Sequence, residues 1–191
     1  MERPTEQLMA EHDVIERYLE VLEVALARLE TGRDVPEKVF LGEADFFRSF
    51  VDLCHHAKEE SLLFPKFQER GIPSQGGPVG QMLSEHEEGR GLVRAFAEAA
   101  ERVGSHDPKA QLELIRAGRA YASLLKEHIS KENSILYPMG SRLLNPEDEA
   151  WLFEAFERLE AERIGEGVHE GFHRLLEELE SWVKGIKEGQ G

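Results

Sequence analysis

Apolar residues recur at alternating steps of three and four along most of the chain, which is the spacing of one face of an α-helix. Three stripes of this kind cover about residues 47–62, 79–103 and 114–139. The first stripe of the chain runs through Leu8, His12, Ile15, Leu19, Leu22, Leu26 and Leu29. Because no alternating run of Val, Ile and Thr indicates a β-strand, the pattern predicts an all-α protein.

Segments rich in proline and glycine separate these stripes and mark the connections between helices. Four long helices joined by such short connections predict an antiparallel, up-down-up-down four-helix bundle over residues 1–145. In two connections, Asp107 and Asn145 are placed to cap a helix whose first position is the following proline. The connections are TGRDVP near residue 34, GIPSQGGP at 71–78, GSHDP at 104–108 and LLNPED at 143–148.

The remaining residues, 146–191, predict an additional C-terminal helix that packs on the bundle as part of the same domain. This helix runs from about Pro146 towards Trp182, and the glycines of GEG at 165–167 predict a break or kink within it. The terminal KEGQG is expected to be frayed.

Charge and cysteine content restrict the partners and the compartment of the protein. The 191 residues contain 23 Lys and Arg against 38 Asp and Glu, a formal net charge of -15. Such an acidic chain lacks the clustered basic surface that binding to nucleic acid or to an anionic membrane requires. The single cysteine, Cys54, cannot form an internal disulfide, and the chain shows no membrane-spanning apolar run and no signal-peptide pattern. We therefore expect a cytoplasmic protein with no nucleic-acid or membrane partner.

An internal repeat keeps histidine at fixed positions in both halves of the predicted bundle. The segment HHAKEESLLFP, which starts at His55, matches HISKENSILYP, which starts at His128, in residue type. LMAEH, which ends at His12, matches MLSEH, which ends at His86. The offsets are nearly equal, since 128 − 55 = 73 and 86 − 12 = 74. Two helical hairpins of this kind would place equivalent side chains across one approximate two-fold axis.

Histidines and glutamates that lie on the inward stripes are candidate metal ligands. Residues four apart on a helix are neighbours on one face, so each His-x-x-x-Glu pair presents an imidazole and a carboxylate to the same point. Charged glutamate is rarely buried unless it is paired or binds a cation, and a metal site would satisfy all of these groups at once. The six candidates are His12, His55, Glu59, His86, His128 and Glu132.

Mixed imidazole and carboxylate ligands without a thiolate suit iron, manganese or zinc better than calcium or copper(I). Four imidazoles and two bridging carboxylates offer about eight donor atoms, fewer than two octahedral ions require. A bridging oxo or hydroxo group and a small exogenous ligand would complete the coordination. This composition favours a non-haem di-iron centre with two iron ions, and zinc or manganese are the alternatives.

These residues resemble the hemerythrin-like (HHE cation-binding) family. The resemblance rests on the six candidate ligands and on the segments HHAKEESLLFP, GGPVGQMLSEHEEGR and KEHISKENSILYP, and it covers roughly residues 5–142. It implies a four-helix bundle that holds two irons and binds dioxygen, nitric oxide or peroxide, with the histidines as terminal ligands and both glutamates bridging. Oxygen-carrying hemerythrins have a histidine at the position of Arg90 and an aspartate five residues after the last ligand histidine, whereas Glu132 is four after His128. Both departures argue against simple reversible oxygen storage.

Further histidines lie outside this set of six. His56 would point about 100° away from His55 along an α-helix; it is an extra ligand, a support for a ligand or exposed, and we favour a position outside the ligand set. His169 and His173 form a His-x-x-x-His pair that can chelate a metal. Either of them replaces the histidine missing from the third helix, or both face surface glutamates. His106, in a turn, is expected to be exposed.

Three functions of different class fit these observations. A binding or sensing module would respond to dioxygen, nitric oxide or peroxide through a change in helix packing that a partner protein detects. An enzyme would consume peroxide or nitric oxide with the same ligands. A structural bundle would hold no metal. We favour binding or sensing, with a detoxifying enzyme as the alternative, and no residue pattern identifies a protein partner.

Overall fold

The structure, a computed structural model, describes residues 3–104, 107–163, 165, 167–187 and 189. His106 and most of the terminal KEGQG lie outside these residues, so their expected exposure and fraying stay predictions. The helices are α1 (Pro4–Glu30), α2 (Glu37–Phe46), η1 (Phe47–His56), η2 (Glu59–Leu63), α3 (Phe64–Glu69), α4 (Pro78–Val103), α5 (Pro108–Lys131), η3 (Glu132–Leu136), α6 (Tyr137–Ser141), α7 (Pro146–Arg163) and α8 (Val168–Lys187).

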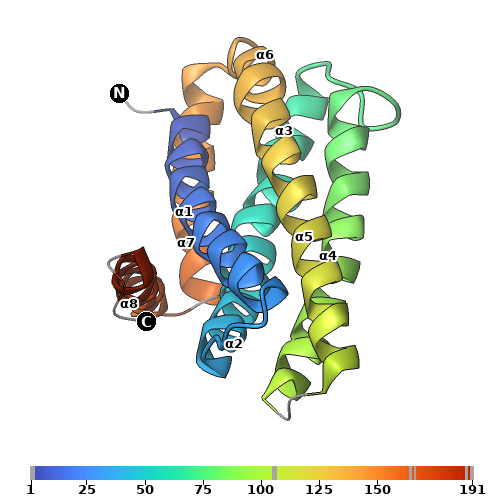
Figure 1. Ribbon diagram of the computed structural model, residues 1–191. Helices are drawn as coiled ribbons and strands as arrows, with labels where there is room; N and C mark the ends of the chain where they lie inside the picture. Colours follow the sequence, from blue (N-terminus) through green and yellow to red (C-terminus); the bar gives the residue numbers. More distant parts are fainter. Residues whose placement is uncertain (1–2, 105–106, 164, 166, 188, 190–191) are drawn as a thin grey trace.

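Four helical rods form the bundle (Figure 1). The first rod is α1, the second runs continuously from α2 to α3, the third is α4, and the fourth runs from α5 through η3 to α6. The predicted all-α, antiparallel four-helix bundle is thus confirmed. Within the described ranges there is no β-strand, and no helix is long and apolar enough to cross a membrane.

The caps predicted at two helix starts are present. The Asp107 side chain accepts a hydrogen bond from the Lys109 backbone N–H at 3.0 Å at the start of α5. At the start of α7, the Asn145 side chain accepts from the Asp148 backbone N–H at 2.9 Å, and Asp148 accepts from the Asn145 backbone N–H at 3.1 Å. These bonds satisfy backbone donors that no helical carbonyl reaches.

The additional C-terminal helix is confirmed, and it is divided into α7 and α8 at the predicted glycine break. Gly165 and Gly167 have φ angles of 84° and 82°, a backbone conformation that favours glycine. In Figure 1, α7 runs along α1, and α8 lies at the side of the bundle next to α1. The Tyr18 hydroxyl of α1 donates to the Phe172 carbonyl of α8 at 2.7 Å.

Parts of the second and fourth rods are wound as π-helix, namely η1, η2 and η3. A π-helix closes its hydrogen bonds over one residue more than an α-helix, so each residue turns by less than the about 100° of an α-helix. η1 ends with His55 and His56, η2 begins with Glu59, and η3 begins with Glu132. π-Helical turns are frequent at functional sites, and these three carry candidate ligands.

Two hydrophobic clusters fill the bundle, and a layer of polar side chains lies between them. On every rod the candidate ligands come between a member of one cluster and a member of the other. The successions are Leu8–His12–Ile15, Leu63–Glu59–His55–Val51, Met82–His86–Val93 and Leu136–Glu132–His128–Leu125. Apolar packing on both sides therefore fixes the distance between the rods where the polar layer lies.

Candidate metal centre

The six candidate ligands predicted from the sequence meet in this polar layer. Each is at most 2% exposed. Burial of so many ionisable side chains in one place is unfavourable unless they pair with one another or with a cation. The layer contains His12 from α1, His55 and Glu59 from the second rod, His86 from α4, and His128 and Glu132 from the fourth rod.

The four histidines form two pairs whose ring nitrogens face each other. In the first pair, His12 Nε2 lies 2.9 Å from His55 Nε2. In the second pair, His86 Nε2 lies 3.1 Å from His128 Nε2. Only one hydrogen fits between two such nitrogens, so each pair presents at least one lone pair to the middle of the layer. Such lone pairs are common ligands of transition metals.

The other ring nitrogen of each histidine is held by an oxygen acceptor at the edge of the layer. Because this acceptor takes the Nδ1 hydrogen, Nε2 is the nitrogen left facing the centre, as it is in histidines that bind metals. The contacts are His12 Nδ1–Asn133 Oδ1 at 2.8 Å, His55 Nδ1–Glu11 Oε2 at 2.8 Å, His86 Nδ1–Glu60 Oε1 at 2.7 Å and His128 Nδ1–Glu85 Oε2 at 3.0 Å.

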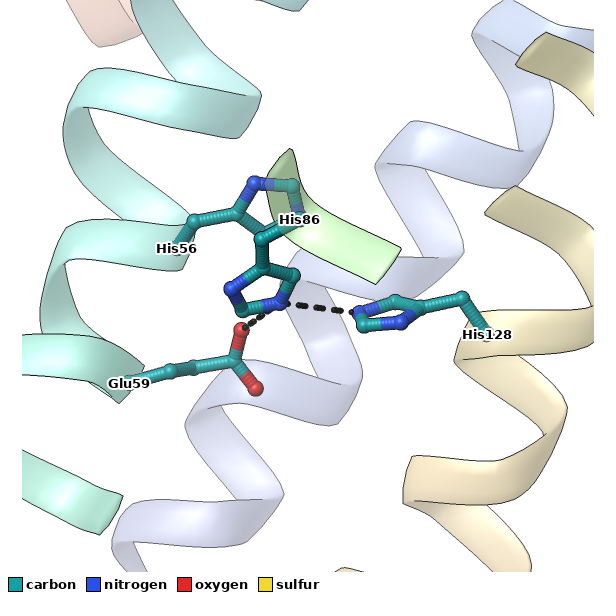
Figure 2. Close-up of side chains that lie close together, drawn as sticks. All are labelled: His56, Glu59, His86 and His128. Atoms are coloured by element: carbon teal, nitrogen blue, oxygen red, sulfur yellow. Dashed lines mark hydrogen bonds and ion pairs between the residues drawn. The ribbon is translucent and has the colours of Figure 1, made fainter. Parts of the chain in front are cut away.

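Glu59 and Glu132 lie between the two pairs, and each glutamate approaches one histidine of the first pair and one histidine of the second. Figure 2 shows Glu59 directed at the facing nitrogens of His86 and His128. A carboxylate in this position is placed to bridge two cations. The distances are 3.3 Å from Glu59 Oε2 to His86 Nε2, 3.8 Å from Glu59 Oε2 to His55 Nε2, and 3.3 Å from Glu132 Oε2 to both His12 Nε2 and His128 Nε2.

Three carboxylate oxygens of this layer accept no hydrogen bond from the described residues, namely Oε2 of Glu59 and both oxygens of Glu132. The remaining oxygen, Oε1 of Glu59, accepts from the Tyr137 hydroxyl at 2.6 Å. A fully buried carboxylate oxygen without a donor is strongly disfavoured, whereas a cation satisfies it. The nitrogen and oxygen donors present therefore fit a metal centre.

Protons and metal ions compete for the same nitrogens. Burial would lower the pKa of His86, but the nearby carboxylates of Glu59 and Glu60 raise it to about 9. Burial would also lower the pKa values of His12 and His128, but contact with Glu132 raises them above the ordinary value. A cation that binds at these Nε2 atoms must therefore displace protons.

The sequence pattern of the hemerythrin HHE cation-binding domain matches residues 3–140, which include both histidine pairs and both carboxylates. The chain belongs to the hemerythrin HHE cation-binding family. Uncharacterized proteins of Mycobacterium bovis and of Mycobacterium tuberculosis (strain H37Rv) are each 25% identical to it over 181 residues. These matches cover 95% of this chain and 69% of each relative. Family membership and the buried cluster together indicate a metal-binding protein.

In this hemerythrin HHE domain, His56 lies inside the cluster and not beside it. Its ring stacks on His86 with centroids 3.9 Å apart and planes 17° from parallel (Figure 2). One His56 nitrogen lies within 4.8 Å of ligand atoms of Glu59, His86 and His128. Burial, together with the nearby histidines, lowers its pKa well below the ordinary value. The π-helical winding of η1 turns His56 inward, which an α-helical period does not predict.

The other two candidate histidines, His169 and His173, lie on α8 with their rings 4.8 Å apart. Among the described residues, two groups could each hold a common metal ion, namely His56, Glu59, His86 and His128, and His12, His55 and Glu132. His169 and His173 belong to neither group. Arg90, at the position where oxygen-carrying hemerythrins have histidine, donates to Asp52 at 2.8 Å and to Glu60 at 2.6 Å. The structure thus brings no histidine of α8 to the place of the missing ligand.

The acceptors at the edge of the layer were not predicted, although the repeat contains a signal for them. A glutamate precedes both His12 and His86, and these glutamates, Glu11 and Glu85, are acceptors for the histidine of the neighbouring rod. Each of these two glutamates also binds a lysine, and the two lysines occupy equivalent positions in the repeat. Lys58 Nζ donates to Glu11 at 2.6 Å and to Glu160 of α7 at 2.7 Å, and Lys131 donates to Glu85.

We expect the two equivalent lysines to differ in their importance for stability. The Lys58 side chain is 0% exposed, so Lys58→Met leaves Glu11 buried without its cation and lowers the free energy of unfolding by about 3 kcal/mol. The Lys131 side chain is 36% exposed, so water replaces the ammonium of Lys131→Met at a loss of about 1 kcal/mol or less. Urea unfolding of both metal-free variants tests this, and equal losses would contradict it.

Metal affinity is expected to rise between about pH 6 and about pH 9, by up to about tenfold per pH unit for each proton displaced. His86, with a pKa of about 9, holds a proton in this range that a cation must remove. Because that pKa is raised above 6.5, its contribution to the stability of the metal-free protein is complete below pH 6.5 and is lost as pH rises through about 9. Chelator competition and urea unfolding at several pH values measure the two opposite trends. An affinity that is constant with pH would contradict proton displacement.

Proposed function

We propose that this domain binds two iron ions as a non-haem di-iron centre and uses it to bind or sense a small ligand such as dioxygen, nitric oxide or peroxide. The observation that carries the proposal is the position of Glu59 and Glu132, which lie between two histidine pairs with oxygens that no described donor reaches. Two carboxylates that bridge and two imidazoles at each end suit two ions better than one.

The donor set favours iron over softer or simpler ions. Nitrogen and oxygen are the donors at the centre, and burial raises the pKa of the nearby Cys54 thiol to about 12, so no thiolate competes at neutral pH. A structural zinc site is closed by four ligands, whereas bridging carboxylates on two histidine pairs leave coordination positions for an exogenous ligand. Zinc and manganese remain the alternatives that metal analysis distinguishes.

The protein contributes orientation and a dry environment. The four acceptors at the edge of the layer fix the imidazole rings, and the Tyr137 hydroxyl fixes one carboxylate oxygen of Glu59. Hydrophobic clusters on both sides of the layer limit the access of water to the ligands. When bound, iron would supply the reactivity towards oxygen, nitric oxide or peroxide. The same arrangement would serve an enzyme that removes peroxide or nitric oxide, and sustained turnover of either substrate would favour that alternative.

We expect Glu59→Ala and Glu132→Ala each to lose most of the iron while the bundle stays helical, because each change removes a bridging carboxylate. The double variant His169→Ala, His173→Ala serves as the control and should keep its iron, since both histidines lie outside the cluster. Metal analysis, circular dichroism and the visible absorption with and without azide measure the outcome. Full iron retention in both glutamate variants would rule out the proposed ligand set.

A further inference from the structure

A cavity of about 350 Å³ between η1, α4 and α5 ends at His56, whose ring stacks on the candidate ligand His86. Its walls include Asp52 and His56 from η1, Gly89 and Val93 from α4, and Tyr121 from α5. A single water molecule occupies about 30 Å³ in the liquid, so the cavity has room for a molecule of several atoms. The exposed residues Arg94, Glu98 and Glu101 of α4 also line it, so the cavity runs from His56 to the space outside the bundle.

The two halves of the repeat differ on this side of the centre. With the offset of 73, His56 corresponds to Ile129 in the second half, where the side chain belongs to a hydrophobic cluster. With the offset of 74, Arg90 corresponds to Glu16. The cavity, the imidazole of His56 and the arginine thus meet beside the pair formed by His86 and His128, and the otherwise symmetric centre has one distinct side.

Arg90 leaves the space next to that pair open. Its guanidinium is drawn to Asp52 and Glu60, at 2.8 Å and 2.6 Å, and so is held at the wall of the cavity. Arg90 is thus paired with two carboxylates, and an ion held by His86 and His128 would have no ligand from this position of α4.

His56 is a polar group without a partner at the inner end of the cavity. It is 4% exposed, and neither ring nitrogen forms a hydrogen bond within the described ranges. The nearest carboxylate oxygen, Asp52 Oδ1, is 3.7 Å from Nδ1, too far for a hydrogen bond. The ring is stacked face to face on His86, and one of its nitrogens lies within 4.8 Å of ligand atoms of Glu59, His86 and His128. A molecule bound beside His86 and His128 would therefore lie close to a nitrogen that has no other hydrogen-bond partner among the described residues.

A second cavity, of about 320 Å³, lies on the opposite side of the centre, with Glu11, Val14 and Phe50 among its lining residues. Neither cavity is lined by any of the six ligands, but Glu11 is paired with Lys58, whereas the nitrogens of His56 have no hydrogen-bond partner among the described residues. The ion pair between Glu11 and Lys58, together with the hydrogen bond from His55 to Glu11, lies between the second cavity and the first histidine pair.

We infer that the exogenous ligand enters through the cavity between η1, α4 and α5, binds on the side of the centre held by His86 and His128, and is contacted there by His56. This inference rests on the proposed di-iron function and adds to it the side of access and the residue that recognises the ligand. The ligand class is a small molecule or anion of two or three atoms with a hydrogen-bond acceptor, for which azide is the probe.

Filling each cavity in turn tests the route. Val93→Phe narrows the cavity at His56, and Val14→Phe makes the same change in the cavity on the opposite side. With iron-loaded protein, stopped-flow absorption should show azide association about tenfold slower in Val93→Phe and within about twofold of the parent rate in Val14→Phe. Slower association in Val14→Phe, or the parent rate in both variants, would overturn the route.

Substitution of His56 tests the contact. His56→Phe keeps an aromatic ring on His86 but removes both nitrogens, so the dissociation constant for azide should rise about tenfold while the iron content stays unchanged. His56→Gln restores a donor and should recover part of the affinity. Loss of one iron in His56→Phe would show that His56 is a metal ligand and overturn its proposed role. If Val93→Phe fails to fold, the two His56 variants still decide the question.

The parent protein separates failure of this inference from failure of the proposed function. Parent protein that retains no iron, or shows no azide-dependent absorption, overturns the di-iron function and this inference with it. Parent protein that retains iron and binds azide, with Val93→Phe at the parent association rate and His56→Phe at the parent affinity, overturns this inference alone.

Discussion

The structure depends on the burial of two carboxylates among four imidazoles in the middle of a helical bundle. Neither Glu59 nor Glu132 has enough donors among the described residues, and both are 0% exposed. Such burial is tolerated only if the surrounding structure holds it in place and a counter-charge compensates it. Two hydrophobic clusters supply the first condition, because every rod packs apolar residues on both sides of the layer. The counter-charge comes in part from the histidines, whose raised pKa values favour their protonated, positively charged form. Metal ions would supply the counter-charge in full.

The two-fold symmetry of the repeat explains most of the centre, and the departures from symmetry explain how its two sides differ in structure. In both halves a ligand histidine contacts a glutamate, and that glutamate also binds a lysine. The tyrosine that contacts Glu59, Tyr137, corresponds to Phe64, and the buried His56 corresponds to Ile129. The repeat therefore sets the positions of the ligands, whereas substitutions in one half open the cavity and leave an imidazole unpartnered.

The helical period and the repeat were sufficient to predict the bundle, the glycine break and the meeting of six residues, because all three depend on spacing along the chain. For His56 an α-helical period left open an extra ligand, a support for a ligand or an exposed side chain, whereas η1 is wound as π-helix and buries the residue beside His86. The partners of the histidine Nδ1 atoms come from other rods, as Glu11 does for His55. Such contacts depend on how rods pack, and a single sequence carries this only indirectly.

The C-terminal helices are joined to the centre by charge as well as by apolar packing. Lys58 is shared between Glu11, which holds His55, and Glu160, which belongs to α7. Because one ammonium serves two carboxylates in a buried position, a movement of Glu11 alters how strongly Lys58 holds Glu160. The proposed sensing function would require that ligand binding at the centre changes a contact outside the four-helix bundle. The position of Lys58 between the centre and α7 supplies a physical connection of this kind.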